Sequence, residues 1–169
     1  AQVAMFSVVH QIRQAVLQLP TLLNTVSFSV LSRLQGRNEV DTFRRVFWSN
    51  LTINAAFAIA AITVLIAFAG PLLQLYGRDF ADGRLLLVIL LVSVVPESLA
   101  VSFYQLIQSA GRMWYSLFAI VIPRDLLYVA LATVLVGRSG VTGAAMAYPA
   151  AWTVALILIF LSVRKRLLT

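Results

Sequence analysis

Two charged residues occupy positions that membrane-spanning helices would place at mid-depth. Glu97 lies inside the apolar run 85–111, and Arg124 lies about ten residues into the next run, which begins at Trp114. An ionised side chain at the centre of a bilayer costs at least about 2.5 kcal/mol on insertion scales, so each should face water or a partner. Only the turn 110–113 separates the runs, so the two helices should be antiparallel, with Glu97 and Arg124 at similar depth. The pattern predicts that they interact, either as a buried ion pair that fixes helix register or as part of a functional site.

Asp125 and Arg13 are the other charged candidates within the apolar runs. Asp125 follows Arg124 directly, about 100° round a helix, so it is expected to face a different neighbour. Arg13 lies in the first run, residues 2–31, which contains no carboxylate. Arg13 therefore either reaches an acid on another helix or stays free to bind an anionic ligand.

Uncharged polar residues accompany Arg13 at helical spacing. His10, Gln14 and Asn24 fall on or beside one face of the first helix, together with Thr21. In the second run Asn54 shares a face with a second asparagine four residues earlier. These groups either hydrogen-bond to neighbouring helices or line a polar cavity.

Composition defines the elements that must position these residues. The chain of 169 residues is 61% hydrophobic and 11% charged, and its mean hydropathy is +0.93. Such values are typical of an integral membrane protein. The apolar runs are helix-length, unlike the ten-residue alternating segments of a membrane barrel, so the predicted fold is an all-α polytopic helix bundle.

Several other classes of function are not expected from the composition. The chain has no cysteine and a single histidine, so disulfides, thiolate metal sites, a cysteine nucleophile and His-rich metal sites are not expected, and no cofactor is predicted. The sequence pI is about 10.8. The basic residues stand between apolar runs rather than on one connected surface, which does not favour nucleic-acid binding.

The apolar runs predict one transmembrane domain, residues 1–169, with spans at about 2–31, 46–69, 85–109, 114–136 and 141–163. Pro20 should kink the first span without ending it, and Gly70-Pro71 should end the second. The polar segment 32–45 is expected to be a loop or a short surface helix. In the fifth span Gly143, Ala147 and Ala151 form a small-residue stripe suited to close helix packing inside the bundle.

The distribution of basic residues predicts an orientation. One side would hold eight basic residues and the other only Arg78, Arg84 and Arg138. The eight are Arg33, Arg37, Arg44, Arg45, Arg112, Arg164, Lys165 and Arg166. The positive-inside rule then puts the C-terminus in the cytoplasm and, with five spans, the N-terminus outside. The start at Ala1 in an apolar stretch further suggests additional upstream spans.

Four segments, taken in order, resemble the C-terminal part of polysaccharide flippases of the multidrug/oligosaccharidyl-lipid/polysaccharide exporter superfamily. They are LPTLLNTVSFSVLSRLQG at 19–36, AGPLLQLYGRDF at 69–80, QSAGRMW at 108–114 and SGVTGAAMAY at 139–148. Each segment is weak alone, and their order and spacing carry the likeness over nearly the whole chain. One departure is Ser29, where family members typically have a proline.

The resemblance implies a two-lobed, non-enzymatic transporter of the bacterial inner membrane, with this chain as most of the second lobe. The implied cargo is a lipid-linked oligosaccharide, flipped by alternating access for lipopolysaccharide or exopolysaccharide synthesis. The implied partners are membrane lipid, the N-terminal lobe and polysaccharide biosynthesis proteins. Arg13 and Arg124 would hold the anionic headgroup, and Glu97 or Asp125 would couple transport to an ion or proton.

Three alternatives compete with a flippase. One is a cation-coupled multidrug or peptidoglycan-precursor exporter of the same superfamily. Another is a membrane enzyme acting on lipid-linked sugars, which would need acid, base or metal-binding groups on loops; the loop carboxylates are Glu39, Asp41, Asp79 and Asp82, with no histidine beside them. The third is a scaffold in which the charges inside the spans are purely structural.

Overall fold

The chain folds into a bundle of long helices. The computed structural model describes residues 2–37, 39–77, 80, 83–109, 111 and 113–167, and within these it does not describe the side chains of Gln2, Ser109 and 163–167. The main helices are α1 (Gln2–Gly36), α2 (Val40–Ala67), α4 (Arg84–Val92), α5 (Val94–Ser109) and α7 (Ile122–Leu167). Shorter helices are α3 (Ala69–Gln74), α6 (Met113–Ser116) and the π-helical turn η2 (Leu117–Val121). The prediction of an all-α bundle is confirmed.

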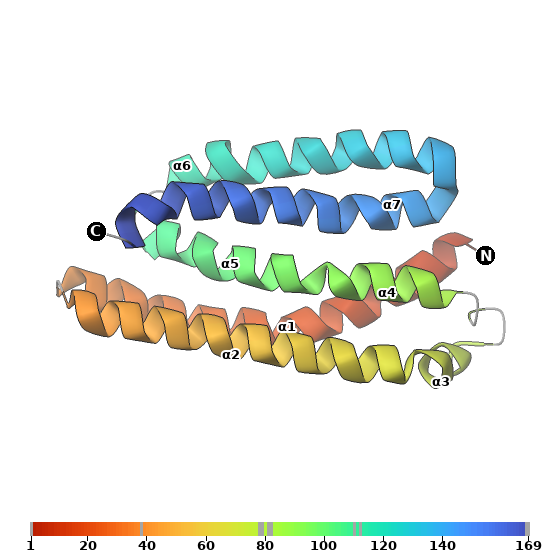
Figure 1. The fold of residues 1–169 in the computed structure, drawn as a ribbon, viewed down its shortest axis with the longest axis horizontal. Coiled ribbons are helices and arrows are strands. Elements are labelled where there is room, and N and C mark those ends of the chain that lie inside the picture. Colours follow the sequence, from red (N-terminus) through yellow and green to blue (C-terminus); the bar gives the residue numbers. More distant parts are fainter. Residues whose placement is uncertain are drawn as a thin grey trace.

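Four helical stretches of the described chain are long and apolar enough to cross a membrane, and the last of them is too long for a single crossing. It runs over 50 residues, Met113–Ser162, which at about 1.5 Å per residue is roughly 75 Å, against a hydrocarbon core of roughly 30 Å. Gly140 divides it, with φ 58° and ψ −138°, a backbone conformation that is essentially restricted to glycine. Figure 1 shows α7 folding back there as a hairpin. The chain is therefore a multi-pass membrane protein, and the fold of the last stretch into two arms gives five long helical segments in the described chain.

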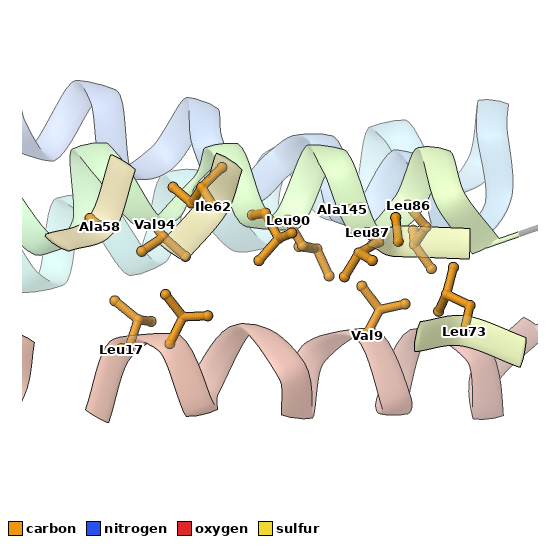
Figure 2. Packing of buried hydrophobic residues seen from close by; sticks show 13 residues of the cluster. Val9, Leu17, Ala58, Ile62, Leu73, Leu86, Leu87, Leu90, Val94 and Ala145 are labelled. Carbon is orange, nitrogen blue, oxygen red and sulfur yellow. The ribbon is translucent and has the colours of Figure 1, made fainter. Parts of the chain in front are cut away.

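The central crossing is made by α4 and α5, which lie between the α1–α2 pair and the α7 hairpin (Figure 1). Half of its most apolar window is buried inside the protein, against 22–28% for the other three stretches. Leu87, Leu90 and Val94 on this crossing pack against Val9 and Leu17 of α1, as Figure 2 shows. Every other element of the bundle is therefore positioned relative to α4 and α5.

Prolines mark the irregular points of the helices. Pro20 lies inside α1, as predicted. Pro96 cannot donate a hydrogen bond to the carbonyl of Val92, and α4 ends at that residue. The single-turn π-helix η2 directly precedes the turn that contains Pro123. The wider π turn gives space to the proline ring, which would otherwise collide with the carbonyl four residues earlier.

Two expected helix ends differ from the structure. Segment 32–45 is almost entirely helical, because α1 continues to Gly36 and α2 begins at Val40. A helix satisfies its backbone groups at any depth, and long arginine side chains extend from it to the interface. At the opposite end α2 stops at Ala67, before Gly70-Pro71, which belongs to the short helix α3.

The small-residue stripe of α7 packs inside the bundle, as predicted. Ala147 and Ala151 are buried, and the stripe continues to Ala155. A Cβ added to Gly143 would collide with the backbone carbonyl of Leu135 on the other arm of the hairpin. The absence of a side chain at Gly143 therefore allows the two arms of α7 to approach closely.

Candidate functional site

Arg13 is the most deeply buried charged residue of the described structure, at 1% exposure. Its Nη2 donates to the carboxylate of Glu97 on α5, and its Nε donates to Ser93 Oγ at 3.1 Å. The guanidinium lies over the ring of Tyr148, 4.5 Å from the centroid. Its Nη1 is buried and makes no hydrogen bond. Arg13 thus contacts α5, the break between α4 and α5, and α7, while its Nη1 makes no hydrogen bond.

The predicted pairing of Glu97 with Arg124 is wrong, because Glu97 pairs with Arg13. Equal depth on sequential antiparallel helices left open which helix the carboxylate would face. α1 packs along both α4 and α5 and presents Arg13 at the break around Ser93. Of the two alternatives for Arg13, the structure shows the first: it pairs with an acid on another helix.

Arg124 has a local partner instead. Its Nη2 lies 2.6 Å from Asp125 Oδ1, and its Nε donates to the same oxygen at 2.8 Å. The guanidinium lies 4.2 Å from the ring centroid of Trp152, on the second arm of α7. Asp125 therefore does not face a different neighbour as expected, because its side chain turns back toward the adjacent arginine.

Both ion pairs line one cavity of about 150 Å³. Its walls come from α1, α5 and the two arms of α7, and they are formed by Arg13, Gln14, Glu97, Arg124, Asp125, Tyr128, Tyr148, Ala151 and Trp152. The lining carries two cations and two carboxylates, so its formal charge is zero. Five of the eight residues singled out from the sequence meet here: both arginines, both acids and Gln14.

His10 lies beside this cavity and is not among its lining residues. Its Nε2 is 3.2 Å from Gln14 Nε2. Its ring centroid lies 5.9 Å from that of Phe6 and 5.7 Å from that of Tyr148. His10 therefore contacts two residues of the cavity wall, Gln14 and Tyr148, without lining the cavity itself.

Asn24 and Asn54 lie elsewhere, in a buried polar cluster between α1, α2 and α5. Asn24 Oδ1 accepts hydrogen bonds from Nδ2 of Asn50 at 2.9 Å, from Nδ2 of Asn54 at 2.8 Å and from Ser102 Oγ at 3.1 Å. Of the two interpretations of these asparagines, interhelical hydrogen bonding is the one that the structure supports.

The aromatic residues of the cavity were not predicted. Tyr128 follows Arg124 by four residues, and Trp152 follows Tyr148 by four, so each pair shares a helix face. The rings of Tyr128 and Tyr148 pack edge to face with centroids 4.7 Å apart, joining the two arms. The i, i+4 spacing was visible in the sequence, but only the hairpin makes the two pairs face each other.

A polar stripe runs along α1 and includes Gln14, which lines this cavity. Its residues are exposed in the described structure and follow heptad-like spacing: Ser7, Gln11, Gln14, Gln18, Thr21 and Thr25. A second hollow, of about 350 Å³, lies against the stripe and is lined by Gln14, Leu17, Gln18, Thr21 and Leu22. A row of exposed amides in a membrane-spanning helix is expected to face water or other protein rather than lipid.

No group of three or more metal-ligating side chains occurs in the part of the chain that the structure describes. Comparisons with protein-family models, with curated proteins and with solved structures found no match. The cavity and the polar stripe of α1 are therefore the features of the molecule that bear on its function.

Proposed function

We propose that this chain is a lobe of a transporter that flips a lipid-linked oligosaccharide or polysaccharide precursor across the cytoplasmic membrane by alternating access. The observation that supports this most is the cavity inside the membrane-spanning bundle, which holds two arginines beneath aromatic rings. Guanidinium groups bind phosphate oxygens in a bidentate way, and fixed charges stabilise an anion in a region of low dielectric. The diphosphate of a lipid-linked sugar needs such stabilisation when it crosses.

The polar stripe of α1 supports a passage for a hydrophilic cargo. Amide and hydroxyl side chains both donate and accept hydrogen bonds, so they suit sugar hydroxyl groups. Trp152 and Tyr148 offer rings on which a sugar can pack. The stripe leads along the helix from Gln14, which also lines the cavity. In this proposal an N-terminal lobe, the expected partner, faces the stripe and completes an aqueous passage.

The proposal extends to location and context. The protein would reside in the bacterial inner membrane with its C-terminus in the cytoplasm, following the bias of basic residues. Its partners would be membrane lipid, the lipid-linked oligosaccharide and the proteins of lipopolysaccharide or exopolysaccharide synthesis.

The cavity favours an anionic cargo over a cationic drug, because Arg13 keeps a buried donor, Nη1, that makes no hydrogen bond. A cation site would need a carboxylate free to bind it, and both carboxylates of the cavity are engaged by arginines. A membrane enzyme is less well supported, since Glu39 lies exposed within 4.0 Å of Arg37, and Asp79 and Asp82 lie outside the described residues.

Arg124→Gln tests the proposal most directly, because the Arg124–Asp125 pair lies within one helix, so its loss should affect helix packing less than loss of the Arg13–Glu97 pair between helices. We expect at least about a tenfold loss of flipping, as one charge-assisted contact is worth about 1.5–3 kcal/mol. The measurement is complementation of a flippase-deficient strain, with the amount of protein in the membrane determined alongside. Arg138→Gln, an exposed arginine next to the hairpin turn, is the matched control. Wild-type complementation by Arg124→Gln would contradict the headgroup role.

A further inference from the structure

The cavity is electrically neutral before any cargo enters, and this constrains how it can bind an anion. Arg13, the buried cation, is already neutralised by Glu97. An anion that approaches Arg13 adds negative charge next to that carboxylate. Glu97 is only 13% exposed, so water screens the resulting repulsion poorly.

We infer that the cavity binds an anion together with a proton, which Glu97 takes up as the anion replaces it at Arg13. This inference rests on the proposed function and names what regulates that site. Before binding, the Glu97 carboxylate accepts a hydrogen bond from Arg13 Nη2. After binding, the guanidinium donates to the anion, and a proton from water has added to a carboxylate oxygen of Glu97. With one proton taken up, a monovalent anion leaves the cavity neutral, and a dianion such as sulfate leaves it with one negative charge instead of two.

The unused donor of Arg13 supplies the starting contact. Nη1 is buried and makes no hydrogen bond, while Nε remains anchored to Ser93 Oγ. An anion can therefore first bind Nη1 while Glu97 still holds Nη2. Protonated Glu97 then becomes a donor and can hydrogen-bond to the anion that it would have repelled as a carboxylate.

The other titratable groups around Glu97 do not replace it in this role. α7 contributes Arg124, Asp125, Tyr128 and Tyr148, and α1 contributes Arg13 with His10 behind the cavity. The Asp125 side chain is 58% exposed and pairs with Arg124 rather than with Arg13. At the α4–α5 break the hydroxyl of Ser93 faces Arg13, and the polar cluster that α2 forms with α1 and α5 is built of amides and hydroxyls.

Binding and protonation are reciprocally linked in this scheme. If a proton enters with the anion, anion affinity falls as pH rises through the titration of Glu97. The limit is a tenfold loss per pH unit for one proton. At low pH, where Glu97 is already protonated, the dependence disappears.

The test uses the full chain in lipid nanodiscs and sulfate, an anion whose own charge is constant between about pH 5 and 9. Binding is followed by fluorescence of Trp152, which contacts Arg124, with Trp152→Phe to identify the signal. Calorimetry in two buffers of different ionisation enthalpy counts the protons taken up. We expect weaker sulfate binding at higher pH and a net proton uptake of up to one.

Glu97→Gln imitates the protonated carboxyl, so it should bind sulfate with an affinity that does not vary with pH and without proton uptake. Asp125→Asn should keep the pH dependence, whatever its absolute affinity. Sulfate binding by the wild type with no proton uptake would overturn the inference and leave the proposed function intact. Failure of both the wild type and Glu97→Gln to bind sulfate at any pH would instead contradict the proposed anion site.

Discussion

Arg13 and Glu97 form the strongest structural constraint at the level of single residues. Moving an ionised group out of water costs several kcal/mol, and a buried pair compensates for this only with good geometry and further hydrogen bonds. Ser93 and the ring of Tyr148 provide such contacts to Arg13. The pair therefore joins α1 to α5, and it occupies the cavity proposed for the cargo.

Arg13→Ala should lower stability by about 3–5 kcal/mol, because it leaves the Glu97 carboxylate buried without a counter-charge. Loss of function in this variant alone would therefore not identify a headgroup contact. The measurement is unfolding in a titration of denaturing detergent, read by the loss of helical signal.

The double variant Arg13→Met with Glu97→Leu is the control, since it removes both charges and keeps apolar volume. It should regain most of the stability and still fail to flip cargo. A double variant as unstable as Arg13→Ala would show that the ion pair is not the cause of the loss.

Asn24 is a second residue whose effect should be measurable. Asn24→Ala removes the acceptor shared by Asn50, Asn54 and Ser102, so we expect a loss of about 0.6–1.7 kcal/mol, which spans the average and the largest value for interhelical hydrogen bonds in a membrane protein. Thr25→Ala is the matched control, because the Thr25 hydroxyl bonds only within its own helix, to Thr21 O at 2.9 Å. Equal detergent stability of the two variants would remove the network as a stabilising element.

At the level of elements, the α7 hairpin builds most of the cavity. Its first arm supplies Arg124, Asp125 and Tyr128, and its second arm supplies Tyr148 and Trp152. The arms come together at Gly140, and Gly143 approaches the backbone of the opposite arm. The spacing of the arms therefore determines whether the aromatic rings cover the arginines.

Gly143→Val should push the arms apart, because any side chain there collides with the carbonyl of Leu135. We expect a loss of at least about 1–3 kcal/mol, typical of overpacking, and a change in Trp152 fluorescence as its contact with Arg124 is altered. Gly137→Ala is the matched control, since a Cβ there would meet nothing within 4 Å. A Gly143→Val protein with the wild-type detergent midpoint would contradict the close packing of the arms.

At the level of the whole molecule, the two ends of the chain lie at opposite ends of the bundle. Figure 1 shows the N-terminus at the end of the bundle with α3 and the α7 turn, and the C-terminus at the end with the α1–α2 connection. The residues of that connection include Arg33, Arg37, Arg44 and Arg45. These basic residues lie together at one end of the bundle, and the positive-inside rule predicts that this end faces the cytoplasm.

The orientation can be measured cleanly, because the chain contains no cysteine. Gly36→Cys and Ser139→Cys place single thiols at exposed positions at opposite ends. A membrane-impermeant maleimide added to intact cells, after permeabilisation of the outer membrane, should label Ser139→Cys and spare Gly36→Cys. The reverse pattern would invert the proposed topology, and labelling of both would contradict an odd number of crossings between them.

The sequence alone determined the class of fold, because apolar length and composition are local properties. Lipid forces each apolar run to satisfy its backbone internally, so runs of this length must be helices, and residues 137–140 had to be the turn between two of them. The small-residue stripe at Gly143, Ala147 and Ala151 was predictable for the same reason. The ends of the helices were harder to predict. The arginines in 32–45 suggested a loop, but they do not prevent a helix from extending toward the interface.

Only the tertiary structure decided which charges meet. The depth of a residue along a helix follows from its position in the sequence, which put Glu97 and Arg124 at the same depth. How each helix is rotated, and which helices are its neighbours, depends on packing over the whole bundle. α1 lies against α4 and α5, so Arg13, 84 residues away in sequence, takes the carboxylate. Arg124 then pairs with the adjacent Asp125 and packs on Trp152. Sequence spacing specifies a face of one helix, whereas a pair between helices requires the arrangement of all of them.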